Sequence, residues 1–490
     1  MKTTGMKILS VASECYPLIK TGGLADVVGA LPPALARRGV ETRVLLPGYA
    51  SVLARLADAP AEVVFEYDSL LGLPARLISA RLEGLDLILI DCPALYHRAG
   101  GPYLDAAGID HGDNWHRFGA LARAGADIGA GIIPGFKPDV IHAHDWQAGL
   151  TPAYLRYSGI NCPSVMTIHN IAFQGHFSAA VLGGLRLPPH AMALDGVEYH
   201  GGVGFLKAGL ANASAITTVS PTYAEEIRTP QFGMGLEGLI SARAPVLRGI
   251  VNGIDAEVWN PATDPALARR FGPKKLADRL PNRREVEARF RLDADEDPLF
   301  VVVSRLTWQK GIDLLAEVTE DLVAEGAKLA VLGAGEAGLE NAFAGAAARH
   351  AGRIGVVIGY DEGLAHMMQG GADAILIPSR FEPCGLTQLY GLRYGAVPVV
   401  ARTGGLADTV IDANTAALNA GVATGVQFLP VDAAGLRHAI RQAVRLFRQP
   451  GTWAAMQRAG MGADVSWDRS AALYADLYAS LLPVASGHHV

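Results

Sequence analysis

The fold is decided by the stretch Met-Lys-Ile-Leu-Ser-Val-Ala at residues 6–12, which is followed by Lys-Thr-Gly-Gly-Leu-Ala-Asp at residues 20–26. The first stretch is a short apolar run, which predicts a buried β-strand, and the second predicts a glycine turn that opens a helix. Glu14 and Lys20 follow the apolar run closely, so it does not resemble a signal peptide. A strand, a glycine turn and a helix in this order are typical of a doubly wound α/β domain.

The same pattern recurs in two series along the chain. Continuous apolar runs that alternate with helical patterns indicate parallel sheets covered on both faces, so two series predict two Rossmann-like domains. We expect these domains at residues 1–252 and 253–464, with a C-terminal helix at 465–490 and a hinge near Val251–Asp255. The expected strands are Lys7–Ala12, Val40–Pro47, Leu85–Asp91, Asp139–His144, Ser164–His169 and Ala215–Ser220, then Leu299–Ser304, Lys328–Gly333, Ile354–Gly359, Asp373–Ser379, Val397–Ala401 and Gly425–Phe428.

Two further segments of the second half have a recognisable character. The polar, charged stretch Asn260–Arg291 is expected to be connecting structure rather than core. The stretch Gly311–Glu325 predicts one helix, because its apolar side chains recur on a single face. That face consists of Ile312, Leu315, Val318 and Leu322.

Composition excludes several classes of protein. The chain of 490 residues is 50% hydrophobic and 18% charged, which is typical of a globular protein. Its net charge of −6 argues against a general nucleic-acid or anionic-membrane surface. No apolar run approaches the roughly 18 residues of a membrane span. The four cysteines are far apart, which favours a reducing, cytoplasmic location. Met6 is a second possible start beside Met1.

The motif at Lys20–Asp26 has a near copy at Arg402–Asp408, which differs only in its first residue. A Gly-Gly turn at a helix start exposes backbone N–H groups and the positive end of the helix dipole, an arrangement that suits an anion. A preceding Lys or Arg adds charge. The alternative is that both turns need glycine for their geometry alone.

Two motifs of the second half follow expected strands, at the strand end where open α/β sheets bind ligands. Arg305–Gly311 carries two cations, Arg305 and Lys310, that can hold a diphosphate. Arg380–Thr387 carries Glu382, which suits a sugar hydroxyl or a developing positive charge, and a helix start whose N–H groups suit phosphate. Glu382 could instead cap that helix. Cys384 has no visible base partner, so a nucleophilic role is not favoured.

Two motifs of the first half also end strands. His142 and His144 stand two residues apart and therefore share a face. A metal site is not favoured there, because no second set of residues has ligand spacing. Asp145 is the better candidate for a sugar contact, and His169 lies beside it if the two strands are neighbours.

The stretch Gly333–Gly338 matches the GxGxxG pattern of dinucleotide-binding proteins. The match is weak, because this motif normally opens its βαβ unit, whereas here it follows the second strand of the second series. We interpret it as a tight turn, and a dehydrogenase remains an alternative that rests on this motif alone.

Taken together, these motifs resemble those of bacterial glycogen synthases, retaining GT-B glucosyltransferases that elongate α-1,4-glucan. The resemblance runs from about Met6 to about Tyr478. It rests on Lys20–Leu24, His142–Trp146, Thr167–Asn170, Val251–Asp255, Arg305–Gly311 and Glu382–Leu386, which occur in this order.

The resemblance implies a GT-B fold, with two Rossmann-like domains facing a deep cleft and the last helix crossing back to the N-terminal domain. It implies glucose transfer from ADP-glucose to the non-reducing-end 4-hydroxyl of the glucan, without cofactor or metal. The catalytic residues would be Glu382, His169, Asp145, Arg305 and Lys310. Donor contacts would come from Lys20, Gly22, Gly23, Asn252, Tyr360, Cys384, Gly385, Leu386 and Thr387, with Tyr103 against the acceptor.

One residue departs from the wider pattern. Many retaining GT-B enzymes carry a second glutamate eight positions after the first, whereas this chain has Tyr390 there, so a ribose contact from that acid is not expected. The alternatives left open are a UDP-glucose donor, a double-displacement mechanism, and a glucan-binding or regulatory protein without turnover.

Overall fold

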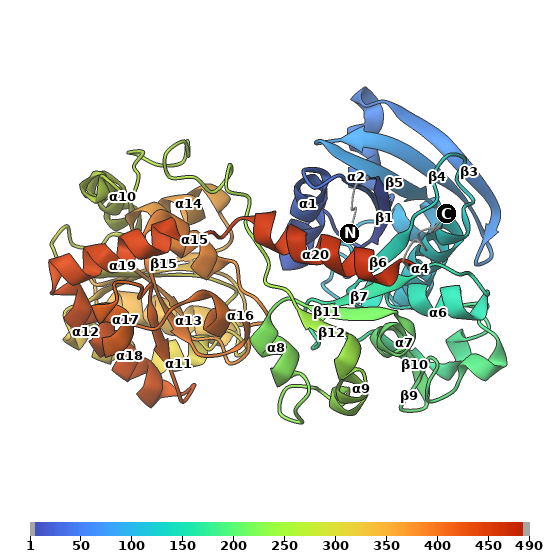
Figure 1. Cartoon of the computed structure of the whole chain (residues 1–490). Coiled ribbons are helices and arrows are strands. Elements are labelled where there is room, and N and C mark those ends of the chain that lie inside the picture. The colour runs from blue at the N-terminus through green and yellow to red at the C-terminus, as the bar shows by residue number, and fades with distance from the viewer. Residues whose placement is uncertain (1–4, 484–490) are drawn as a thin grey trace, which may run out of the picture. The chain divides into compact units, whose positions relative to one another are not determined.

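The structure is a computed structural model that describes residues 5–483, so Met1 and the last residues of the expected C-terminal helix lie outside the described part. The chain forms two compact units (Figure 1). Unit 1 comprises the described residues up to Asn252 together with those from Trp467 onward, and unit 2 is Gly253–Ser466.

Unit 1 is built on a nine-stranded sheet in the order β12-β11-β7-β6-β1-β2-β5-β4-β3. All six strands expected from the first series belong to this sheet. Its strands are β1 (Met6–Val11), β2 (Val40–Pro47), β3 (Ala61–Leu70), β4 (Leu73–Leu82), β5 (Leu85–Asp91), β6 (Val140–His144), β7 (Ser164–Ile168), β11 (Ala215–Thr218) and β12 (Leu247–Gly249). A small second sheet consists of β8 (His176–Ser178), β10 (Gly202–Gly204) and β9 (Glu198–Tyr199).

The helices of unit 1 connect these strands and cover the large sheet. The helix α1 follows the motif at residues 20–26 and returns the chain to β2, which pairs in parallel with β1. The helices are α1 (Gly23–Ala36), α2 (Ala50–Ala54), α3 (Pro93–Tyr96), α4 (Asn114–Ala130), α5 (Asp145–Ala148), α6 (Thr151–Tyr157), α7 (Phe205–Asn212), α8 (Pro221–Glu226), α9 (Glu237–Ala242) and α20 (Trp467–Leu481).

The expectation that the first sheet is wholly parallel is wrong at one edge. Strands β3 and β4 form an antiparallel hairpin, and β4 also runs antiparallel to β5. Leu71 and Gly72 make the two-residue turn, both with positive φ, as tight hairpin turns require. Strand β3 is largely exposed and β4 mixes exposed with buried side chains, so both lack the continuous apolar run that marked the buried strands.

Unit 2 has a six-stranded parallel sheet in the order β15-β14-β13-β16-β17-β18, and all six expected strands belong to it. They are β13 (Leu299–Val303), β14 (Lys328–Gly333), β15 (Ile354–Ile358), β16 (Ala374–Ile377), β17 (Val397–Ala401) and β18 (Val426–Phe428). The helices are α10 (Leu280–Phe290), α11 (Ile312–Glu317), α12 (Thr319–Ala324), α13 (Ala337–Arg349), α14 (Glu362–Gly371), α15 (Thr387–Tyr394), α16 (Gly404–Thr409), α17 (Thr415–Asn419), α18 (Ala433–Phe447) and α19 (Pro450–Gly462).

The stretch Asn260–Arg291 is exposed at many positions but, contrary to expectation, also contributes to the core. It contains α10, whose Val286 and Phe290 pack in the apolar core of unit 2. On the same helix, buried Arg283 pairs with Asp373 at 2.8 Å and with Glu287 at 3.0 Å. The charges that suggested a surface segment are therefore neutralised inside the protein, an arrangement that composition alone does not reveal.

The helix expected over Gly311–Glu325 is two helices, α11 and α12. The chain leaves helical geometry at Val318, where φ is −100° and ψ is 8°. The predicted apolar face is nevertheless buried throughout, because Ile312, Leu315, Val318 and Leu322 all lie in one core cluster. The spacing of the apolar residues therefore predicted which face packs in the core, but not the interruption of the helix at Val318.

The C-terminal helix α20 packs in unit 1, far in sequence from the rest of that unit (Figure 1). Its Trp467, Tyr474 and Tyr478 join a core cluster with residues of α1 and β1. Ser470 also donates a hydrogen bond to the carbonyl of Val251 at 2.5 Å. Over residues 5–483, no helix has the length and apolar character needed to span a membrane.

Candidate functional site

The candidate residues of unit 1 gather at the carboxyl ends of three neighbouring strands. Strands β7, β6 and β1 are adjacent in the sheet, and their ends lead to His169, Asp145 and Glu14. All three side chains are buried. Polar groups buried at strand ends of a parallel sheet are typical of a ligand site in this class of fold.

Glu14 organises the loop that carries the motif at Lys20–Asp26. Its carboxylate accepts hydrogen bonds from the backbone N–H of Thr21, from the Thr21 hydroxyl at 2.6 Å and from the backbone N–H of Gly22 at 3.3 Å. The N–H groups that the sequence suggested for a bound anion therefore meet a carboxylate of the protein itself. Sequence reasoning did not select Glu14, although it is the acidic residue nearest to the end of the first strand.

The cation of this loop is also engaged within unit 1. Lys20 Nζ lies 2.7 Å from Asp26 Oδ1, and about a third of the lysine side chain is exposed. A Cβ atom at Gly22 or Gly23 would meet no atom within 4 Å, so space surrounds both glycines. The loop therefore offers an open surface beside Lys20.

Asp145 and His169 meet as the sequence predicted. Asp145 Oδ1 accepts a hydrogen bond from the backbone N–H of His169 at 2.7 Å and a longer one from Asn170 at 3.4 Å. Asp145 opens α5 with a φ of 53°, a left-handed conformation that is uncommon for residues other than glycine and clusters at functional sites. Burial raises the pKa of Asp145 to about 7, against the lowering effect of the two N–H groups.

Neutral histidines surround this aspartate. Burial lowers the pKa of His169 and of His142 to about 3, and it lowers the pKa of His144 well below its usual value. His142 and His144 share one face, as their spacing predicted, with ring centroids 4.0 Å apart. The cluster is therefore uncharged near neutral pH and provides hydrogen-bonding groups rather than cations.

Tyr103 and Asn252 complete the candidates in unit 1. The Tyr103 hydroxyl donates to Glu14 and lies 2.8 Å from the Ser13 hydroxyl, so the predicted acceptor residue is joined to the loop of Lys20 through Glu14. Asn252 is buried, and its Oδ1 has no hydrogen-bond partner among the described residues. A buried acceptor without a partner is costly unless something else satisfies it, which suits a ligand contact.

In unit 2, the two predicted motifs lie against each other because their strands, β13 and β16, are neighbours. The Arg380 N–H donates to the carbonyl of Gln309 at 2.9 Å. Gly311 has a φ of 65°, and a Cβ there would lie 1.9 Å from the carbonyl oxygen of Pro378. Glycine at this position therefore lets one loop sit directly on the other.

The contact between these loops brings Lys310 to Glu382. Lys310 Nζ lies 2.6 Å from Glu382 Oε2, which also accepts a hydrogen bond from the Ser379 hydroxyl at 2.9 Å. Glu382 is buried and Lys310 is partly buried. Arg305 differs, because its exposed guanidinium forms no hydrogen bond or ion pair with any residue in the described part of the chain. Ser379 is a second residue that sequence reasoning missed; its strand-end position was the available signal.

The segment after Glu382 is held by a second glycine turn. The N–H of Gly405 donates to the carbonyl oxygens of Glu382 and Pro383, both at 3.1 Å. Cys384 is buried, and Gly385 has a φ of 72°, which glycine adopts without strain. Leu386 and Thr387 then open α15, so the predicted helix start is present.

The remaining candidates of unit 2 lie at other strand ends. Tyr360 follows β15 and its side chain is 75% exposed, so its ring can be reached by a ligand. Gly333 and Gly335 allow the turn after β14 to approach the backbone of Ser304 and Leu306, because a Cβ at either glycine would lie about 2 Å from a carbonyl oxygen. This confirms the tight-turn interpretation of the GxGxxG match.

Comparisons with known proteins agree on one family. Residues 7–242 match the family model of the starch synthase catalytic domain, and residues 284–446 match that of glycosyl transferases group 1. The chain is 61% identical over 481 residues to a glycogen synthase of Novosphingobium aromaticivorans, covering 97% of this chain and 99% of the relative. A glycogen synthase of Mesorhizobium japonicum is 60% identical with the same coverage.

Solved structures show the same likeness. The catalytic domain of starch synthase IV from Arabidopsis thaliana, bound to ADP and acarbose, is 30% identical with a TM-score of 0.86, covering 98% of this chain and 99% of that one. A sucrose-phosphate synthase from Thermosynechococcus elongatus has a TM-score of 0.59 at 18% identity, with 97% of this chain and 99% of that one covered, a likeness of fold alone.

Over residues 5–483, the structure brings no group of three or more His, Cys, Asp or Glu side chains into an arrangement for a metal ion.

Proposed function

We propose a donor, an acceptor and residue roles for this chain. The chain belongs to the glycogen and starch synthase family of glycosyltransferases and has a GT-B fold. It transfers glucose from ADP-glucose to the non-reducing-end 4-hydroxyl of an α-1,4-glucan, with retention at C1. The donor is a substrate, no cofactor or metal is part of the proposal, and a cytoplasmic location completes it. The observation that carries the proposal is the Lys310–Glu382 pair, in the same loop as an exposed Arg305 that has no ion pair with any residue of the described range 5–483.

Arg305 and Lys310 would hold the diphosphate of the donor. Arg305 has an exposed guanidinium with free hydrogen-bonding capacity in this structure, and a guanidinium can bind phosphate oxygens through two donors. Lys310 follows in the same loop and pairs with Glu382. Fixed cations at the leaving group stabilise the negative charge that develops there as the glycosidic bond breaks. Lys20 would add a third cation.

Glu382 would orient the glucose and stabilise positive charge at C1. Its Oε2 is already bound by Lys310 and by Ser379, so the carboxylate is fixed in position. Asp145, His169 and Asn252 would line the glucose pocket. Tyr360 would stack on the base of the donor. Other donor contacts would come from Gly22, Gly23 and the Cys384–Thr387 segment. Tyr103 would contact the glucan.

The chemical step we favour is same-face attack. The bond between C1 and the phosphate oxygen breaks, a bond from the acceptor 4-oxygen to C1 forms, and the acceptor proton passes to the departing phosphate oxygen. This step needs no protein nucleophile. In retaining hydrolases a carboxylate attacks C1, and the same double displacement is the alternative here.

The donor proposal is tested by incorporation of labelled glucose into glycogen. We expect incorporation from ADP-glucose, inhibition of that incorporation by ADP, and release of the new glucose by an enzyme specific for α-1,4 linkages. Preferential incorporation from UDP-glucose would overturn the donor but not the reaction type. No incorporation from either donor, with a folded protein, would leave a binding protein.

The residue roles are tested best at Arg305, because removing Lys310 would also leave Glu382 without its partner. Loss of a charge-assisted contact of roughly 1.5–3 kcal/mol predicts that Arg305→Ala lowers kcat/KM by about 10- to 150-fold. Arg458→Ala is the matched control, because Arg458 is an exposed cation on α19 of the same unit. Equal kinetics for both variants would remove Arg305 from the donor site. Glu382→Gln should fold normally and lose most turnover.

A further inference from the structure

Three buried polar side chains of unit 1 form a hydrogen-bonded row that ends at His169. His169 Nε2 lies 3.0 Å from His144 Nδ1, and His144 Nε2 lies 3.1 Å from the Ser10 hydroxyl. All three residues are at most 9% exposed. His169 directly follows β7, His144 ends β6 and Ser10 lies in β1, and these strands are adjacent, so the sheet itself sets the spacing of the row.

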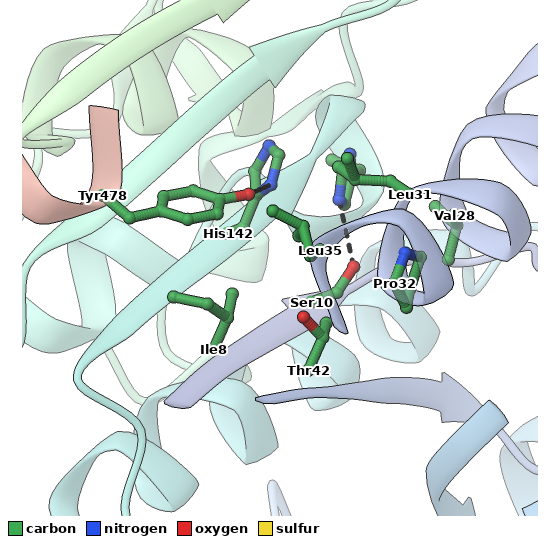
Figure 2. Close-up of a pocket in the computed structure, with 10 residues that line it drawn as sticks. Ile8, Ser10, Val28, Leu31, Pro32, Leu35, Thr42, His142 and Tyr478 are labelled. Carbon is green, nitrogen blue, oxygen red and sulfur yellow. Dashed lines mark hydrogen bonds between the residues drawn. The ribbon is translucent and has the colours of Figure 1, made fainter. Parts of the chain in front are cut away.

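A second row supports the first without touching His169. His142 Nδ1 lies 2.7 Å from the hydroxyl of Tyr478 on α20, and His142 Nε2 lies 2.5 Å from the hydroxyl of Thr167. Figure 2 shows the hydrogen bond between Tyr478 and His142 and that of Ser10 as dashed lines. The His142 ring packs on His144, so the C-terminal helix helps to hold His144 in place.

The proton of the His144–His169 contact can lie on either ring. Because burial keeps both imidazoles neutral, each ring carries one N–H, and only one ring can donate in this contact. If His169 donates, His144 must donate to Ser10, and the Ser10 hydroxyl proton is left buried without an acceptor among the described residues. If Ser10 donates to His144, then His144 donates to His169, so both protons inside the row have acceptors and the one N–H that remains, on His169 Nδ1, is left for a ligand.

The second arrangement is favoured energetically. A buried N–H or O–H group without an acceptor costs roughly 1–3 kcal/mol. A hydroxyl group that already donates its proton leaves only oxygen lone pairs without a partner, which costs less. Ser10 also lines a cavity of about 10 Å³ beside Thr42, whose hydroxyl oxygen has no hydrogen-bond partner among the described residues. A water molecule between Ser10 and Thr42 is the rival acceptor for the Ser10 hydroxyl proton, since a cavity of this size is about large enough for one water.

We propose that Ser10 and His144 are positioning residues that keep His169 protonated on Nδ1, with its Nε2 accepting from His144. His169 then presents an N–H donor from Nδ1 in a fixed orientation. Resting on the proposed function, this donor is directed at a hydroxyl oxygen of the transferred sugar. Ser10 and His144 act through His169 and need no contact with the substrate.

The protonated nitrogen is tested by NMR of the full chain with ¹⁵N-labelled histidine, with the His169 signals identified by their loss in His169→Gln. We expect the wild type to carry its proton on Nδ1. His144→Phe removes the donor to Nε2 and should shift the population toward protonation on Nε2. His144→Asn, whose amide N–H can replace the Nδ1 donor, should restore it. A wild-type His169 protonated on Nε2, or no change in His144→Phe, would overturn the proposal.

Two matched variants separate this role from packing. Tyr478→Phe removes a hydrogen bond from the second row only, so the protonation of His169 should not change. Thr42→Val removes the partner of a water in the cavity, so a change of protonation in this variant would favour the water over Ser10 and overturn the proposed order of donors. A merely structural role would lower the melting temperature of His144→Phe without moving the proton.

Kinetics then connect the row to the reaction. His144→Phe should lower kcat/KM about 10-fold, the effect of one lost hydrogen bond, and His144→Asn should recover most of it. If His169→Gln itself kept wild-type kinetics, the proposed role of His169 at the sugar would fail while the NMR result stood. If His169→Gln were inactive and His144→Phe were fully active, the positioning role would fail.

Discussion

The two glycine turns at Lys20–Asp26 and Arg402–Asp408 share six consecutive residue types and open a helix in their respective units, yet their surroundings differ. In the first turn, backbone N–H groups bind the carboxylate of Glu14. In the second, the N–H of Gly405 donates to the backbone carbonyls of Glu382 and Pro383. One turn thus meets a charged side chain and the other meets neutral backbone.

The space around the glycines differs in the same way. A Cβ at Gly22 or Gly23 would meet nothing within 4 Å. A Cβ at Gly404 would lie 2.0 Å from the carbonyl oxygen of Glu382, and one at Gly405 would lie 2.2 Å from that of Cys384. The first pair leaves an open surface on which a ligand can lie, and the second pair lets two backbones touch. A repeated motif therefore indicates a repeated backbone shape, and its neighbours decide its use.

The largest expected effect is on stability at the second turn. Gly404→Ala places a Cβ against backbone at a position with a φ of 42°, so overpacking of roughly 1–3 kcal/mol adds to left-handed strain of roughly 1–2 kcal/mol. We expect a clear fall in the melting temperature. The displaced carbonyl belongs to Glu382, which is proposed to act in the reaction, so kcat should fall as well, because small misplacements of a catalytic group are costly. Thermal unfolding and steady-state kinetics measure the two effects.

Gly23→Ala is the matched control, since the corresponding site in the first turn is open and α1 starts there. Alanine favours a helix more than glycine does, so the melting temperature should hold or rise slightly. A fall equal to that of Gly404→Ala would contradict the distinction between the two turns. Loss of donor affinity with unchanged stability would support a ligand on the first turn.

A smaller effect is expected at Glu14, which has no counterpart in the backbone contact of the second turn. Glu14→Gln keeps the shape but removes the charge that accepts hydrogen bonds from Thr21, Gly22 and Tyr103. The amide N–H₂ would face at least one of these donors, so we expect a loss of roughly 1–3 kcal/mol in unfolding free energy. Denaturant unfolding measures it. Unchanged stability and kinetics would show that the carboxylate is not needed to shape the loop.

Much of the fold followed from the sequence because burial leaves a strong pattern. The six expected strands of each unit are short, mainly apolar runs, and all of them are present. The hairpin β3–β4 was missed because its strands mix exposed and buried positions and lack that pattern. The core role of α10 was missed because Arg283 and Glu287 are charged yet buried, and only the tertiary contacts with Asp373 and Lys328 show that their charges are compensated.

The site was predictable as a set of strand ends but not as a set of contacts. Strand order explains why Asp145 meets His169 and why Lys310 meets Glu382, and the spacing of the motifs pointed to these residues. Glu14 was not predicted, because its partners Thr21 and Tyr103 are brought to it by loop conformations. His169 was predicted as a site residue, but its contact with His144 was not, since periodicity places side chains on a face without showing their partners.

The smallest stability effect is expected where the two turns differ in sequence. Lys20 pairs with Asp26 at 2.7 Å, whereas the side chain of exposed Arg402 forms no ion pair with residues that the structure describes. A partly exposed pair contributes roughly 0–1 kcal/mol, so Lys20→Gln should leave unfolding almost unchanged. If Lys20 exchanges Asp26 for a donor phosphate, the lost contact should lower kcat/KM for the donor by about 10- to 150-fold. Arg402→Gln should lower neither stability nor kcat/KM, because the N–H groups of its turn already bind backbone carbonyls. Equal kinetics for the two variants would make both turns structural and leave Arg305 and Lys310 as the cations proposed to bind phosphate.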